Sequence, residues 1–219
     1  MMKKNGFTLA EVLITLAIIG VVATLTLPAL MTNVGEQQYK TALKKALNTL
    51  SEAGQMSQAM DGFDYSSFTT STVGGDMEDE HGNVVQSLYS LLQRRTNMAS
   101  FADGSTHKVA ESNYSNNQVV YFRDGTSIIF NPSATSGTQG QPNGFAAIID
   151  INGKKGPNLV SNCAGKDGKA ATNTAAATHD ISKCTGKDNK RIIKDQFPIR
   201  LVRGLAIPNN DAARWAATE

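Results

Sequence analysis

The chain has 219 residues, which is enough for one full-sized domain with an appendage or for two small domains. Charged residues make up only 18% of it and the formal net charge is +2, which argues against a dedicated nucleic-acid binder and against an acidic disordered tail. The mean hydropathy of −0.26 excludes a protein with many membrane-spanning helices.

Apolar residues are concentrated near the N-terminus. Residues 7–30 contain a single charged residue, Glu11, and as a helix rising about 1.5 Å per residue they would cross a bilayer core of about 30 Å. Lys3 and Lys4 precede this segment, so the positive-inside rule places the N-terminus in the cytoplasm and the residues after Leu30 outside it. The segment thus predicts a single-pass anchor in the cytoplasmic membrane.

A cleaved secretory signal peptide is the alternative interpretation of the same segment. Its length, the lack of a clear small-x-small cleavage site and the acidic residue near its start all disfavour that alternative. A carboxylate at membrane depth costs a few kcal/mol, so we expect Glu11 to have a cation as its partner.

The residues before and after the start of this segment form a more specific pattern. A basic leader ends at Gly6, Phe7 opens the apolar stretch, Glu11 is its fifth residue, and Pro28 lies further along. This pattern resembles the leader and methylation segment of type IV prepilins and type II secretion pseudopilins. The resemblance implies that prepilin peptidase cleaves between Gly6 and Phe7 and methylates the new amino group of Phe7. Cleavage would create an α-ammonium four residues before Glu11, which supplies the expected cation.

The same resemblance predicts a structural filament subunit rather than an enzyme. The filament would be a type IV pilus or a secretion pseudopilus, with the head periplasmic or extracellular. The partners would be prepilin peptidase, an inner-membrane assembly platform and other pilin-like subunits, identical or different. The resemblance also assigns Glu11 and Pro28 a role in filament assembly. Because Pro28 lacks an N–H, we expect a kink or loosening there, and the resemblance implies loss of helix from Gly20 to Pro28.

Beyond the apolar segment, the pattern predicts a helix and then a long connection. Apolar residues recur at three- and four-residue spacing from residue 31 to 60, so the helix is expected to continue to about Met60. Residues 61–118 are weakly patterned and are interpreted as a connection carrying one short helix, Val84 to Arg95. The acidic patch from Asp76 to His81 is interpreted as a solvated loop rather than a metal site.

Strand patterns occupy the second half of the chain. Val119 to Phe122 and Thr126 to Phe130 flank an Asp-Gly turn and predict a β-hairpin. After a loop at 131–144, Phe145 to Ile151 predicts a third strand and Pro198 to Arg203 a fourth.

Together the segments predict an α+β fold, pilin-like, in which a long N-terminal helix packs against a small antiparallel sheet. The predicted organisation has four parts: a leader peptide at 1–6, a transmembrane and filament-core helix at 7–30, an amphipathic continuation at 31–60 and an exported globular head at 61–219.

A second motif follows the third strand. Asp150, Asn152 and Gly153 are followed by a Gly-Pro-Asn sequence at 156–158 and later by Asp195, an arrangement that also resembles a segment of pilin-like proteins. Asn-Gly and Gly-Pro are typical of a turn, which is the favoured interpretation. The alternative is a Ca²⁺ site, since Asp150, Asn152 and Asp195 carry hard oxygen ligands, although the twelve-residue EF-hand pattern is missing. Ca²⁺ is the one cofactor that the sequence suggests.

Cys163 and Cys184 are the only cysteines, and they lie on the side expected outside the cytoplasm. We expect them to form a disulfide that closes a loop of about 22 residues and stabilises the fold by about 3 kcal/mol. A zinc site formed with His179 would lack a fourth ligand and is disfavoured.

Two other function classes remain as alternatives. One is a minor pilin that acts as an adhesin or a DNA-uptake module, because residues 154–203 contain 11 basic and 4 acidic residues, whereas the rest of the chain carries a net charge of −5. Phe197 is the one aromatic residue in that stretch, so base stacking, and with it a nucleic-acid partner, is not expected. The less favoured class is a membrane-tethered exported enzyme, since no P-loop, G-x-S-x-G, H-E-x-x-H or dinucleotide motif occurs.

Overall fold

The protein is described by a computed structural model in which two compact units are distinguished, Met1–Gln38 and Tyr39–Glu219. The structure describes residues 6–68, 81–83, 86–103, 108–109, 112–113, 118–130, 145–163 and 191–218.

The long helix α1 (Leu9–Met60) contributes residues to both units. Its part Leu9–Leu27 is long and apolar enough to cross a membrane, by length and composition, and none of that window is buried. The helix assignment runs through Gly20 and Pro28. The loss of helix expected between these two residues is therefore absent from the single chain, because one missing N–H leaves the hydrogen bonds of the neighbouring residues intact.

Within the second unit, α1 is amphipathic, as its spacing predicts. Leu43, Leu47, Leu50 and Ala53 lie on one side of the helix at intervals of three and four residues, and all four are buried. They belong to the main hydrophobic core, which they share with residues from the sheet and from two short helices, α2 (Leu88–Arg95) and α3 (Asp211–Thr218).

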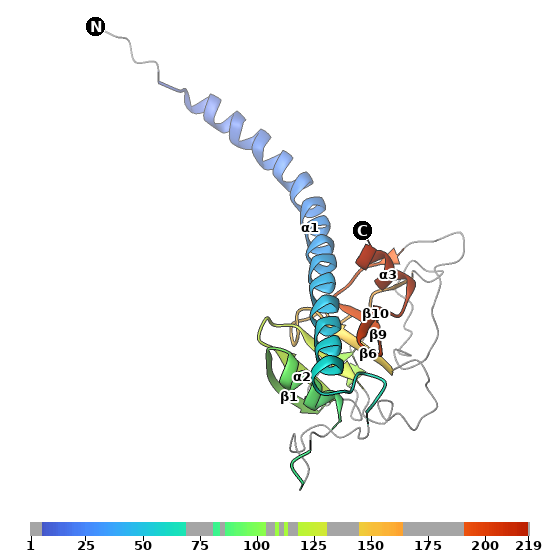
Figure 1. Ribbon diagram of the computed structural model, residues 1–219. Coiled ribbons are helices and arrows are strands. Elements are labelled where there is room, and N and C mark those ends of the chain that lie inside the picture. The colour runs from blue at the N-terminus through green and yellow to red at the C-terminus, as the bar shows by residue number, and fades with distance from the viewer. Residues whose placement is uncertain are drawn as a thin grey trace. The chain divides into compact units, whose positions relative to one another are not determined.

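Among the described residues, six strands form one antiparallel sheet in the order β1-β4-β5-β6-β9-β10. Figure 1 labels β1, β6, β9 and β10 of this sheet. The strands are β1 (Met98–Asp103), β4 (Gln118–Phe122), β5 (Ser127–Phe130), β6 (Phe145–Asp150), β9 (Gln196–Val202) and β10 (Leu205–Pro208). Two shorter ladders join β2 (Lys108–Val109) to β3 (Ser112–Asn113) and β7 (Asn162–Cys163) to β8 (Arg191–Ile192). The α+β fold class is thereby confirmed.

The predicted hairpin is present as β4 and β5, with Val119 opposite Ile129 and Val120 opposite Ile128. Gly125 has a φ of 90° in the turn, a conformation that glycine adopts without steric cost. Because side chains alternate along a strand, Val120 and Ile128 join the core that includes α1, whereas Val119 and Ile129 join a second cluster with Ile148 and Val160.

Four expectations from the sequence need correction. The segment 61–118 is more than a connection with one helix, because it contains β1, which is paired with β4 across a long sequence separation. The short helix begins at Leu88 rather than at residue 84, since the Ser87 side chain accepts a hydrogen bond from Ser90 N and caps the helix there. Strand β10 and helix α3 had no counterpart among the predicted elements.

The fourth correction concerns the ends of two strands. The third predicted strand ends at Asp150 and the fourth begins at Gln196, two residues before its predicted start. The loop at 131–144 and residues 76–80 of the acidic patch lie outside the described residues.

Candidate functional site: the N-terminal segment and the turn after β6

The predicted cleavage site lies in an exposed part of the chain. Phe7 is 90% exposed, and a Cβ placed on Gly6 would have no atom of the protein within 4 Å. Among the described residues, therefore, none would clash with a side chain at position 6.

Thr8 and Glu11 form a reciprocal cap at the start of α1. The Thr8 amide and the Thr8 hydroxyl both donate to Glu11 Oε2, at 2.8 and 2.9 Å, and the Glu11 amide lies 3.3 Å from Thr8 Oγ1. Since α1 begins at Leu9, Thr8 is the N-cap and Glu11 is the third helical residue, which is the capping-box arrangement. Its signal, Thr-x-x-Glu before an apolar run, is visible in the sequence but was not used in the interpretation above.

The cap places the carboxylate close to the predicted new N-terminus. Cleavage between Gly6 and Phe7 would leave Thr8 as the second residue, so both partners of the cap would stay in the mature chain. The carboxylate of Glu11 would then lie next to the first residues of the chain, where the α-ammonium of Phe7 is created. A negative charge at this position also stabilises the helix N-terminus through the helix dipole.

Residues 1–27 match a family model described as the prokaryotic N-terminal methylation motif. The chain carries this motif. It is the signature of the prepilin-type segment of type IV pilins and pseudopilins, so the resemblance drawn from Gly6, Phe7 and Glu11 is confirmed for this segment. The motif supports processing by prepilin peptidase. Among curated proteins and solved structures, nothing matches the chain. The family match therefore concerns the N-terminal segment alone. For the head, the geometry of its residues is the available guide to function.

In the head, the structure brings together the three residues of the predicted turn or calcium site. Asp150 ends β6, Asp195 directly precedes β9, and the side chain of Gln196 donates to Asp150 Oδ2 at 2.8 Å. Asp195 and Asp150 are completely buried. The Asn152 amide donates to Asp150 Oδ1 at 3.2 Å, and Asn152 Nδ2 donates to Asp195 Oδ2 at 3.1 Å.

Asp195 also holds the far end of this turn. Its Oδ2 accepts the Asn158 amide at 2.7 Å and its Oδ1 accepts the Leu159 amide at 2.9 Å. Gly153, with a φ of 63°, lies so close to the β4–β5 turn that a Cβ there would come within 2.7 Å of Gly125 O. A side chain at position 153 is thus excluded by both backbone conformation and space.

These partners bear on whether a cation fits the turn. Ca²⁺ takes six to eight oxygen ligands, but both carboxylate oxygens of Asp195 already accept N–H donors. Two oxygens in the turn, Asn152 Oδ1 and Asn158 Oδ1, are buried and have no hydrogen-bond partner among the described residues. Within the described part of the chain, no group of three or more His, Cys, Asp or Glu side chains could hold a metal. The geometry favours the turn, and calcium binding stays a prediction.

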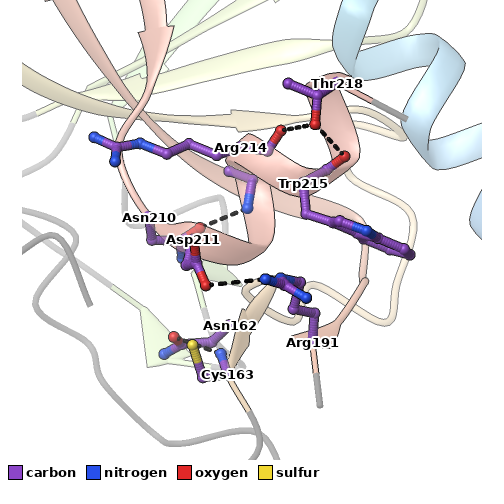
Figure 2. Close-up of polar contacts among 9 residues, drawn as sticks. Asn162, Cys163, Arg191, Asn210, Asp211, Arg214, Trp215 and Thr218 are labelled. Carbon is purple, nitrogen blue, oxygen red and sulfur yellow. Dashed lines mark hydrogen bonds and ion pairs between the residues drawn. The ribbon is translucent and has the colours of Figure 1, made fainter. Parts of the chain in front are cut away.

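The predicted disulfide lies only partly within the described residues. Cys163 ends β7 and is opposite Arg191 of β8, whereas Cys184 and His179 are outside the described part of the chain. Figure 2 shows Arg191 extending toward Asp211 at the start of α3, where the ion pair measures 3.5 Å. The short β7–β8 ladder is therefore tied to the C-terminal helix.

Helix α3, which was not predicted from the sequence, is capped by the residue that precedes it. Asn210 Oδ1 accepts the Ala213 amide at 2.7 Å and so caps the helix (Figure 2). Its Nδ2 donates to Ser161 O at 2.7 Å. On the other side of the helix, the Lys40 ammonium of α1 lies 3.6 Å from the centre of the Trp215 ring. The cap at one end and this cation–π contact fix α3 in place within the second unit.

Proposed function

We propose that the chain is a structural subunit of a type IV pilus-like or type II secretion pseudopilus filament, assembled through its N-terminal helix. The methylation motif at residues 1–27 is the observation that carries this proposal. The unburied apolar surface of Leu9–Leu27 supports it, because such a surface is stable only in lipid or against other apolar helices.

Before assembly, the same helix would anchor the chain in the cytoplasmic membrane with the N-terminus inside and the head outside. Prepilin peptidase would then meet the exposed Gly6–Phe7 peptide at the cytoplasmic face. The cleaved and methylated chain would then bind an inner-membrane assembly platform, which would add it to a polymer of identical or related subunits. Pro28, within the stretch that is helical here, would be the point at which α1 adjusts to its neighbours in that polymer.

Glu11 would make two separable contributions to assembly. Its carboxylate caps α1 through Thr8, as the structure describes. Its negative charge would pair with the α-ammonium of Phe7, either in its own chain or in a subunit that is already docked. Subunits in a filament are offset along its axis, so pairing with a docked Phe7 would set the register of the incoming chain.

Two substitutions separate the cap from the charge. Glu11→Gln keeps an amide oxygen that can accept the Thr8 hydrogen bonds, since glutamine serves in capping boxes, but it removes the charge. Glu11→Ala removes both. We expect both variants to be cleaved at Gly6–Phe7 and inserted in the membrane, with filament yield falling at least tenfold in each. Electron microscopy of sheared filaments measures the yield, and N-terminal mass spectrometry detects N-methylated Phe7.

The outcomes distinguish the steps of the proposal. Normal filaments from Glu11→Gln but not from Glu11→Ala would show that the cap is what assembly needs. Normal filaments from both would remove Glu11 from the register mechanism. Wild-type chains that begin beyond Leu30 would identify an ordinary signal peptide and overturn the filament proposal itself.

A further inference from the structure

A cavity of about 200 Å³ lies inside the second unit, between α1 and the turn that joins β4 to β5. Its apolar wall is formed by Ala46 and Leu50 of α1, Phe122 at the end of β4 and Ile149 of β6. Leu50 and Ile149 are only 2% and 1% exposed, so the inner end of the cavity is closed by the main core. The cavity is therefore a gap in the packing of α1 on the sheet.

The opposite end of the cavity is polar and near the surface. Lys45, Thr49 and Asn97 are exposed, and Asp124 and Thr126 complete this end. A molecule in the cavity would thus place apolar atoms against Leu50 and Ile149 and a polar group toward solvent, where hydroxyl and amide partners are present.

The charges at the polar end already neutralise each other. Lys45 Nζ donates to Asp124 Oδ2 at 2.9 Å, and the Thr126 amide and hydroxyl donate to Asp124 Oδ1 at 3.1 and 2.7 Å. Burial alone would raise the pKa of Asp124, but the hydrogen bonds from Thr126 and Lys45 outweigh it and hold that pKa below its usual value. A charged ligand would have to break this pair, whereas a neutral ligand would leave it in place.

We infer that this cavity is a binding site for a neutral compound with one aromatic ring and one hydrogen-bonding group. An apolar protein cavity of about 150 Å³ is large enough for benzene, so about 200 Å³ accommodates a ring with a small substituent. The ring would contact Leu50, Phe122 and Ile149, and the substituent would reach Thr49 or Asn97. Because the cavity lies between α1 and the sheet, an occupant would strengthen the attachment of the head to the helix.

The probe for this site is 4-fluorophenol, added to the full chain in detergent micelles with ¹³C-labelled isoleucine methyl groups. We expect saturable binding with half-saturation at about 1 mM, as for a ligand of this size, and nuclear Overhauser contacts from the ring to the Ile149 methyl group. Ile199, which is buried in the same sheet but does not line the cavity, serves as the internal control and should show no contact.

A matched pair of variants tests the location. Ala46→Leu puts a larger side chain into the cavity and should weaken binding at least tenfold, whereas Ala42→Leu, one helical turn earlier and outside the lining, should change it less than twofold. Ring contacts at Ile199 equal to those at Ile149, a linear non-saturating response, or equal weakening by both variants would each overturn the inference. The wild-type contacts decide the question even if Ala46→Leu fails to fold.

Discussion

At the scale of single residues, one tyrosine accounts for a glycine in the middle of a helix. A Cβ on Gly54 of α1 would come within 2.5 Å of the Tyr65 ring and 3.0 Å of the Gly204 backbone. Glycine in a helix costs roughly 0.5–1 kcal/mol relative to alanine. Here that cost is offset because the ring of Tyr65 packs directly on the helix, with its hydroxyl donating to Leu50 O at 2.6 Å.

The same tyrosine predicts how stability depends on alkaline pH. Burial raises the pKa of Tyr65 well above its usual value, so the stability that this group contributes is complete below pH about 10 and is lost as the pH rises toward the folded pKa. Tyr65→Phe should lower the free energy of unfolding by about 1 kcal/mol at pH 7, and the deficit should shrink above pH about 10.

Urea unfolding of the wild type and Tyr65→Phe from pH 7 to 11 measures this difference. The pKa of Tyr39 is also raised, by burial and by the nearby Asp195 and Asp150, but Tyr39 is present in both proteins and its effect cancels in the comparison. A deficit that stays constant across this pH range would contradict the prediction.

At the scale of elements, the turn after β6 shows how one carboxylate organises a loop. Asp195 joins the start of β9 to residues 152, 158 and 159, and Ile151 N donates to Asp195 O at 3.0 Å. Val160 then forms a parallel bridge with Gln196. The loop thus returns to β9, which is paired with the strand that precedes it, and Asp150 and Asp195 are buried between the two strands.

Asp195→Ala should therefore destabilise the head whether or not calcium is present. The substitution leaves the partly buried amides of Asn158 and Leu159 without acceptors, at about 1–3 kcal/mol each. We expect a loss of at least about 2 kcal/mol, measured by thermal and urea unfolding in EDTA and in millimolar Ca²⁺. A calcium-dependent rise in the wild-type melting temperature that Asp195→Ala abolishes would instead establish a cation site.

At the scale of the whole molecule, the disulfide tests the orientation of the chain. Cys163 and Cys184 can pair stably only if the residues after Leu30 are exported to an oxidising compartment. Cys163 lies beside Arg191, whose guanidinium is 6.0 Å from the ring of Trp215, the single tryptophan of the chain. Trp215 emission is therefore a probe of the region that the disulfide would hold.

We expect intact mass spectrometry to show that the native protein is lighter by two hydrogens than the reduced protein. Before reduction, neither cysteine should react with an alkylating agent. Reduction should lower the free energy of unfolding by about 3 kcal/mol and shift the unfolding transition of Trp215 fluorescence accordingly. The double variant Cys163→Ser and Cys184→Ser should match the reduced protein and should not respond to reductant. Two thiols that alkylate freely without reductant would contradict the pairing.

Local patterns in the sequence were sufficient for the features whose determinants lie close together along the chain. The methylation motif, the apolar stretch, the amphipathic part of α1 and the β4–β5 hairpin are each formed by one continuous segment of the chain. The capping box of Thr8 and Glu11 and the Asn210 cap of α3 are equally local, so both were accessible from the sequence although they were not recognised there.

The tertiary structure alone decided the features whose partners are distant in sequence. Strand β1 has little apolar alternation of its own and exists through pairing with β4. Strand β10 forms a local hairpin with β9, but its contact with α1, in which Ala206 N donates to Ser51 Oγ, joins residues that are far apart in sequence. The hydrogen bonds of Asp195 and the cavity beside Ile149 likewise depend on how distant segments pack. Composition and spacing describe what a segment can do alone, whereas burial and hydrogen-bond partners are set by the neighbours that the fold supplies.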